Sequence, residues 1–378
     1  MFTLLKNVHL YAPQDMGKQD ILLCGDKIIA IDTHINALAF PTNTIDASGK
    51  IATPGFIDQH IHLIGGGGEA GFNSRTPQVT LSKLVKAGIT TVVGVLGTDG
   101  ISRTPKDLYA KAKALEIEGI RTFMHTGSYE LPSRTITGNI RDDITFIPAI
   151  LGVKIALSDH RCSFPTRQEL LRIVSDIRIA GMLSGKKGVL HIHMGDLPTA
   201  FDLINAVVEA GLPAHHLSPT HVARNEKLFE QAVAFAKRGT HIDITSGGSK
   251  FTEQYDAVKL ALEAGVDYRH ITISSDGNGS VPRFNEKREV IGLGAAPVDG
   301  NVKLLPKLIN AGIPMAQAVA MFTENVAHSL GITGGCIKAG SVGDLCLFND
   351  DLTLNRVYAK GQLMFEEGGF VARGNFEE

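Results

Sequence analysis

The sequence predicts an α/β fold: a (β/α)8 barrel of the TIM type, with a small β-sandwich domain formed by the N- and C-terminal segments. From residue 51 onward, short β-branched segments alternate with amphipathic stretches, which is typical of a parallel α/β sheet. Six of the eight segments carry a polar or ionisable residue near their C-terminal end, the edge at which barrels build active sites. The two chain ends show short alternating runs with turn signals, which favours antiparallel β structure. An open doubly wound sheet is the alternative.

The expected strands follow one another along the chain. In order they are IATPGFIDQHIHL, GITTVVGVLG, GIRTFMHTGSY, VKIALSDH, GVLHIHMGD, LSPTHV, THIDITSG and ITISSDGNG. Between most of them lie stretches that are apolar at three- and four-residue spacing, which predicts helices, although the link at 130–152 has a weak helical signal. We expect residues 1–53 and 340–378 to form the β domain and 54–339 the barrel. For 281–300, a mobile loop over the site is one interpretation that the sequence leaves open.

Composition narrows the class of partner. The 378 residues include 37 Lys and Arg against 39 Asp and Glu, a formal net charge of −2, so we expect no nucleic acid or membrane partner and a small-molecule substrate instead. No charged leader precedes a sustained apolar segment, and no run is long enough to cross a bilayer, which predicts a cytoplasmic chain. The four cysteines are scattered without Cys-x-x-Cys spacing, so any metal is expected on histidine, carboxylate or a less usual ligand.

The first expected strand carries two histidines in the segment GFIDQHIHL. On a strand, His60 and His62 point to the same side as Asp58, while the intervening apolar residues point to the other side. Alone, this spacing fits a metal site and two hydrogen-bonded structural histidines about equally well.

Later strands add residues at the same edge of the barrel. The full set of strand-end candidates is His60, His62, Lys154, His193, His221 and Asp276. Four imidazoles and a carboxylate favour a zinc-like divalent ion. Lys154 lies in an apolar strand, where an unpaired ammonium is costly. A neutral lysine can add carbon dioxide and become a carbamate that bridges two cations. The alternative is an ordinary Lys154 whose ammonium reaches an acid or the surface.

At this point the motifs resemble a known family. GFIDQHIHL, the lone strand lysine, the later single histidines and the final SSDG follow the ligand order of the metal-dependent amidohydrolase superfamily, with its split terminal β domain. Within it, HLIGGGGEAG, LGTDGISRTP, GSYELPSRTITG, SDHR, HMGD, PTHVAR and SSDGNGS look like the isoaspartyl dipeptidases, over nearly the whole chain.

The resemblance implies a role for each matched residue. His60, His62 and Asp276 would hold one Zn²⁺ and His193 and His221 a second, with carboxylated Lys154 (N6-carboxylysine, from CO₂) and a hydroxide between the two ions. Tyr129 would polarise the scissile carbonyl, and Asp276 would shuttle the proton. Substrate would be bound by the remaining matched residues: Glu69 on the α-amino group, Arg161 and Arg224 on carboxylates, and Gly67, Thr98 and Ser280 lining the site.

The implied activity is hydrolysis of β-aspartyl dipeptides to aspartate and an amino acid. Such a dipeptide carries one amino group and two carboxylates, which one acid and two arginines complement. The family also implies an even-numbered homo-oligomer, such as an octamer. Two other functions stay open: a cyclic amide hydrolase like dihydropyrimidinase or dihydroorotase, and a non-catalytic scaffold.

Several polar residues have less clear expectations. His191 repeats the His-x-His pattern with His193 and is expected to pack or to support a ligand. For Arg161, pairing with Asp159 at the surface is the alternative to substrate binding. Asp58 is expected to form hydrogen bonds deeper in the barrel.

Overall fold

The computed structural model describes residues 2–36, 38–247, 249, 251–284 and 290–377, and its centre is a parallel barrel. The eight strands pair in chain order: β6 (Phe56–Ile61), β7 (Ile89–Gly94), β8 (Arg121–Thr126), β9 (Ile150–Leu157), β10 (Val189–Met194), β11 (Leu217–Thr220), β12 (Ile242–Thr245) and β13 (Ile271–Ser274). A parallel bridge between Ile61 and Gly277 brings the first and last strands together. This confirms the barrel and rules out the open sheet.

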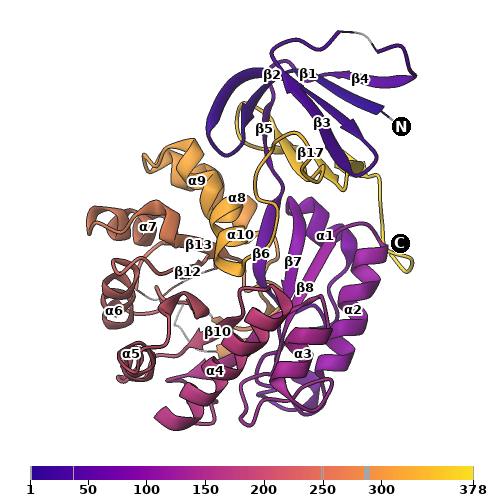
Figure 1. Ribbon diagram of the computed structural model, residues 1–378. Coiled ribbons are helices and arrows are strands. Elements are labelled where there is room, and N and C mark those ends of the chain that lie inside the picture. Colours follow the sequence, from indigo (N-terminus) through magenta and orange to yellow (C-terminus); the bar gives the residue numbers. More distant parts are fainter. Residues whose placement is uncertain (1, 37, 248, 250, 285–289, 378) are drawn as a thin grey trace.

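Helices surround this barrel on the outside (Figure 1). They are α1 (Leu81–Lys86), α2 (Pro105–Ile117), α3 (Ile140–Phe146), α4 (Arg167–Ser184), α5 (Asp202–Glu209), α6 (Glu226–Ala236), α7 (Gln254–Glu263), α8 (Gly300–Asn310), α9 (Met315–Phe322) and α10 (Glu324–Leu330), with 3₁₀ turns at Phe72–Ser74, Ala214–His216 and Tyr268–His270. Capping boxes start α2 and α4, where Thr104 and Thr166 each exchange hydrogen bonds with an acid three residues on. The weak helical signal at 130–152 corresponds to α3, which has only seven residues.

The two terminal segments pair into a second sheet beside the barrel (Figure 1). Its strands are β1 (Phe2–Tyr11), β2 (Asp15–Cys24), β3 (Lys27–Asp32), β4 (Thr42–Asp46), β5 (Ile51–Pro54), β16 (Leu345–Phe348), β17 (Leu354–Ala359), β18 (Gln362–Glu366) and β19 (Gly369–Phe370). Hydrogen bonds connect all nine strands, and this sheet, built from both terminal segments, forms the expected β domain. Most pairs are antiparallel, as predicted, but β1 pairs in parallel with both β4 and β5.

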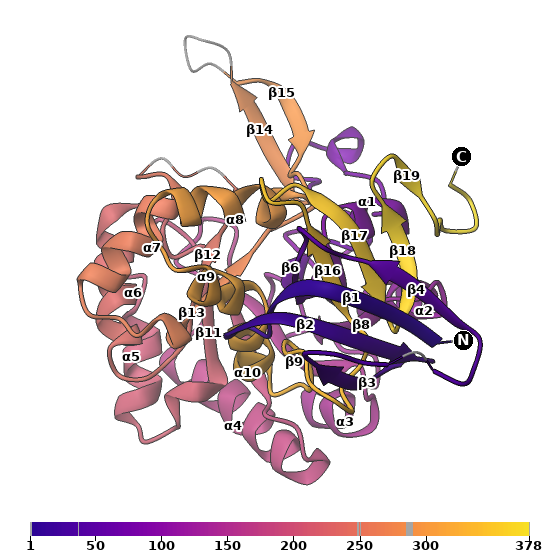
Figure 2. The same cartoon turned by 90° about the horizontal axis from the view of Figure 1, so that it is seen from above.

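The stretch 281–300, left open as a loop, contains a β-hairpin. Strands β14 (Ser280–Phe284) and β15 (Val290–Ala295) pair antiparallel, and the hairpin projects from the barrel (Figure 2). Residues 285–289, also part of that expectation, lie outside the described residues. Helix α8 begins at Gly300. Among the helices that the structure describes, none has both the length and the apolar character needed to cross a membrane.

Candidate active site

The predicted ligand residues meet at the C-terminal ends of the barrel strands. The six residues are His60 in β6, His62 one residue after it, Lys154 in β9, His193 in β10, His221 directly after β11 and Asp276 two residues after β13. All are buried except Asp276, whose side chain is 27% exposed. His221 and Asp276 have left-handed backbones, with φ of 62° and 53°. Strained backbone of this kind clusters at functional sites, where it aims a side chain.

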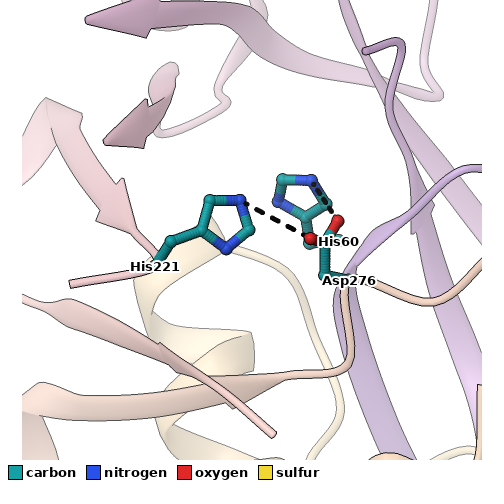
Figure 3. A group of neighbouring side chains, drawn as sticks. All are labelled: His60, His221 and Asp276. Atoms are coloured by element: carbon teal, nitrogen blue, oxygen red, sulfur yellow. Dashed lines mark ion pairs between the residues drawn. The ribbon is translucent and has the colours of Figure 1, made fainter. Parts of the chain in front are cut away.

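Three of these side chains form a compact group around one point (Figure 3). Ligand atoms of His60, His221 and Asp276 all lie within 4.8 Å of one another. Asp276 Oδ1 is 3.3 Å from Nε2 of His60 and 3.3 Å from Nε2 of His62, and Asp276 Oδ2 is 4.0 Å from Nε2 of His221. One carboxylate therefore faces three imidazoles, two from the end of β6 and one from the end of β11.

Lys154 lies beneath this group with no exposed surface. Its Nζ is 3.1 Å from His60 Nε2, and no carboxylate of the described residues lies within ion-pair distance of it. Burial lowers the pKa of Lys154 to about 7, although the negative charge of Asp276 acts in the opposite direction. The side chain reaches neither an acid nor the surface, and a large fraction of the amine is neutral near pH 7.

His193 bonds through both of its ring nitrogens. The Tyr129 hydroxyl lies 2.5 Å from Nδ1, and Nε2 lies 2.8 Å from Asp159 Oδ2. The ring of His193 is 4.7 Å from that of His221, centroid to centroid. Burial lowers the pKa of His193 to about 3 and raises that of Tyr129, so the imidazole is neutral and the phenol protonated at neutral pH.

The cluster fits a divalent metal. Burial also holds the pKa values of His60 and His221 well below their usual value, which leaves neutral imidazoles with lone pairs to donate. Within the described part of the chain, the buried atoms His221 Nε2 and His62 Nδ1 have no hydrogen-bond partner, and His221 Nε2 belongs to the three-residue group. Buried polar atoms rarely stay unpaired, and nitrogen and carboxylate donors are the ligands that zinc prefers.

Charged groups lie at the rim of this cluster. Glu69 Oε1 accepts hydrogen bonds from Arg161 Nη1 at 3.1 Å and from Thr98 Oγ1 at 3.0 Å. Arg224 approaches from the β11 side, with Nη1 3.9 Å from Asp159 Oδ2. The rim thus presents one carboxylate and two guanidiniums from three loops.

Two remaining predicted residues lie against each other. A Cβ placed on Gly67, which has φ of +86°, would lie 3.0 Å from the Ser280 Cβ and 2.3 Å from the Ser74 carbonyl oxygen. Only glycine therefore allows the loop after β6 to approach Ser280 this closely.

Two residues support the predicted site from outside the ligand set, and for His191 the sequence already offered this role. His191 Nε2 is 2.9 Å from Nδ1 of His60, and His191 Nδ1 is 3.1 Å from Ser218 Oγ, so His191 supports a predicted ligand. Asp159, which the alternative interpretation of Arg161 placed at the surface, is 1% exposed. An acid two residues after an apolar strand was the only signal available for it.

Asp58 has the expected role deeper in the barrel. Its carboxylate accepts hydrogen bonds from the backbone N–H groups of His60 and Ser275 and from the Asn301 amide. Burial raises the pKa of Asp58 to about 7. The side chain thereby joins the first and last strands just below the candidate metal site.

Comparison with known proteins identifies the family. The sequence pattern described as the amidohydrolase family matches residues 51–364. The chain belongs to the amidohydrolase family. It is therefore a hydrolase, and the candidate metal site at its strand ends agrees with the general metal dependence of amidohydrolases.

A deacetylase of Agrobacterium fabrum is 25% identical over 86% of this chain and 77% of its own length. The crystal structure of a beta-aspartyl dipeptidase from the thermophilic, keratin-degrading Fervidobacterium islandicum, in complex with beta-Asp-Leu, is 40% identical, covers 100% of both chains and superposes with a TM-score of 0.93. The dihydropyrimidinase of Brevibacillus agri, 16% identical over 99% of this chain and 97% of its own, has a TM-score of 0.76 and shares the fold.

Proposed function

We propose that this amidohydrolase cleaves β-aspartyl dipeptides to aspartate and a free amino acid. The observation that carries the proposal is the rim of Glu69, Arg161 and Arg224 beside the histidine cluster. One carboxylate and two guanidiniums complement one ammonium and two carboxylates, whereas a neutral cyclic amide has no use for this set. The 40% identity to a beta-aspartyl dipeptidase over the whole chain supports the same substrate class.

The residues present would hold two zinc ions. We assign His60, His62 and Asp276 to one ion and His193 and His221 to the other, with Lys154 as a carbamate between them. The neutral amine favoured by burial is the form of Lys154 that adds carbon dioxide. When bound, such a centre acidifies water towards a pKa of about 7 and polarises a carbonyl.

The other steps belong to side chains of this chain. Burial would raise the pKa of Asp276, but the hydrogen bond and charge of His62 hold it below its usual value, so the carboxylate is ionised and can accept a proton from the attacking water. It then returns this proton to the departing amine. Tyr129, protonated at neutral pH, donates to the oxygen of the scissile carbonyl.

Binding of the dipeptide fixes the reacting bond beside these groups. Glu69 binds the α-amino group, and Arg161 and Arg224 bind the carboxylates. Gly67, Thr98 and Ser280 line the site. The Glu69–Arg161 contact seen here would then give way to contacts with the substrate.

The test is the release of amino acid from β-Asp-Leu and α-Asp-Leu, before and after treatment with a chelator, with metal content measured on the same sample. We expect two metals per chain and chelator-sensitive cleavage of the β isomer. Two metals with turnover of dihydrouracil but of neither dipeptide would replace this proposal with a cyclic amide hydrolase. A metal-free protein without activity would favour the scaffold.

A further inference from the structure

Asp159 lies at the centre of the site although neither the predicted metal ligands nor the predicted substrate contacts include it. It follows β9 by two residues, and its neighbour Ser158 has a left-handed φ of 54° that turns the chain inward. The Asp159 side chain is 2% exposed. A buried carboxylate needs strong compensation, so its contacts identify what it serves.

Both oxygens of Asp159 are fully used. Oδ1 accepts hydrogen bonds from the backbone N–H of Arg161 at 2.9 Å and from Arg161 Nε at 2.8 Å. Oδ2 accepts from Arg161 Nη2 at 2.8 Å and from His193 Nε2 at 2.8 Å. Two of these donors belong to the Arg161 guanidinium, which is always charged, so Asp159 pairs with it as a carboxylate.

The bond to His193 determines which ring nitrogen can bind metal. A carboxylate accepts only from N–H, so Asp159 places the proton of His193 on Nε2 and leaves the Nδ1 lone pair facing into the site. Metal-binding histidines are commonly oriented through their second nitrogen in this way. In the present structure, the Tyr129 hydroxyl lies 2.5 Å from that lone pair.

The bonds to Arg161 determine where its guanidinium points. Asp159 occupies Nε and Nη2, which leaves Nη1 directed towards Glu69 Oε1 at 3.1 Å. The Arg161 guanidinium also lies 5.3 Å from the centre of the Tyr129 ring. Arg224 Nη1 is 3.9 Å from Asp159 Oδ2, so the same carboxylate attracts both arginines.

We propose that Asp159 is a positioning residue that couples the two halves of the site: it orients His193 for metal and aims Arg161 and Arg224 at the carboxylates of the substrate. This inference rests on the proposed dipeptidase function for its substrate half. Its metal half depends only on the contact between Asp159 and His193.

The test compares Asp159→Asn with the wild-type holoenzyme and with Asp196→Asn, a matched change at an exposed acid after β10. The first measurement is zinc affinity by competition with a chromogenic chelator. We expect Asp159→Asn to bind zinc about 10- to 100-fold more weakly. Asp196→Asn should bind it like the wild type.

The second measurement uses substrates that differ by one carboxylate: β-Asp-Leu, β-Ala-Leu, which lacks the α-carboxylate, and β-Asp-leucinamide, which lacks the terminal one. In the wild type, loss of a carboxylate held by an arginine should lower kcat/KM by about 10- to 100-fold. In Asp159→Asn, removing a carboxylate from the substrate should lower kcat/KM by a smaller factor, because Arg161 and Arg224 are no longer held in position to bind it. A merely structural role would lower the rates on all three substrates alike.

The proposal would be overturned if folded Asp159→Asn bound zinc as tightly as the wild type. It would also be overturned if removing a substrate carboxylate lowered kcat/KM by the same factor in both proteins. If Asp159→Asn does not fold, Asp159→Glu keeps the buried charge but moves both oxygens, and the same two losses are expected. Failure of the wild type to cleave β-Asp-Leu would overturn the proposed function, whereas the zinc measurement would still test the Asp159–His193 contact.

Discussion

At the scale of single residues, the surroundings of Lys154 fit a modified side chain better than an ammonium. The amine is fully buried, and its nearest polar contact is His60 Nε2 at 3.1 Å. A free ammonium at this position would lie beside the metal ions that the proposal requires, whereas a carbamate would bind them. In the proposed centre, the chemical state of this one side chain would therefore determine whether two ions are retained.

We expect Lys154→Ala to lose metal and to lower β-Asp-Leu cleavage by on the order of 100-fold or more, because the bridging oxygens are gone. Metal content and a ¹³C NMR carbamate signal after incubation with labelled bicarbonate measure the cause directly. Lys187→Ala is the matched control, since burial also lowers the pKa of Lys187, to about 8, while its Nζ bonds the His328 carbonyl oxygen away from the site. Full zinc occupancy with normal turnover in Lys154→Ala would refute the role.

Residues of the site differ in how far the sequence could predict them. The ligand candidates stand out because an ionisable side chain at the end of an apolar strand is a local pattern. Asp159 contacts His193, which is 34 residues away in the sequence, and His191 contacts His60, which is 131 residues away. Only the packed barrel brings these partners together. Asp159 next to Arg161 looks like an ordinary surface pair until burial is known.

At the scale of elements, strands β9 and β10 carry Lys154 and His193 and approach each other closely at Gly152. Gly152 pairs with Val189, and a Cβ on Gly152 would lie 1.8 Å from the Val189 carbonyl oxygen. Such an overlap with backbone cannot be relieved by rotating a side chain. The spacing of the two strands, and hence of the two site residues, depends on this glycine.

Gly152→Ala should therefore lower the free energy of unfolding by about 1–3 kcal/mol, and it should weaken zinc binding because the two strands move apart. Urea denaturation and chelator competition measure the two effects. Gly369→Ala, in β19 with no atom within 4 Å of the added Cβ, should change stability by less than about 0.5 kcal/mol. Equal stability of the two variants would show that the strands tolerate the extra volume.

Elements were predictable where their signal is local. The eight barrel strands are short apolar runs between amphipathic helices, and all eight were found. The β14–β15 hairpin escaped prediction because Pro282, which pairs with Leu293, normally argues against a strand. The parallel pairing of β1 with β5 joins residues about 40 apart in the sequence and has no local signature.

At the scale of the whole molecule, the barrel and the terminal sheet share their apolar interior. Alternate residues of β16 point to different sides: Leu345 and Leu347 belong to the core of the terminal sheet, whereas Cys346 and Phe348 belong to the core of the barrel. Sequence patterns predicted two regions but could not show that one strand contributes to both cores. The terminal segments thus help to complete the barrel.

Phe56 is the residue that connects the two parts most directly. It starts β6 and is fully buried. Its ring stacks on that of Phe322 in α9, with 5.1 Å between the ring centroids, and lies tilted beside that of Phe348 in β16, with 6.1 Å between the centroids. We expect Phe56→Ala to cost about 3–5 kcal/mol, since it leaves a cavity between barrel and sheet. Phe376→Ala, at an exposed phenylalanine near the C-terminus, should cost less than about 0.5 kcal/mol.

The decisive measurement for Phe56→Ala is amide hydrogen exchange followed separately in β16–β18 and in β9–β10. Because the shared core links these strands, protection should fall in both groups, and zinc affinity should fall with it although no ligand has changed. Loss of protection confined to the terminal sheet, with zinc affinity intact, would instead show that the barrel holds its metal site without the terminal segments.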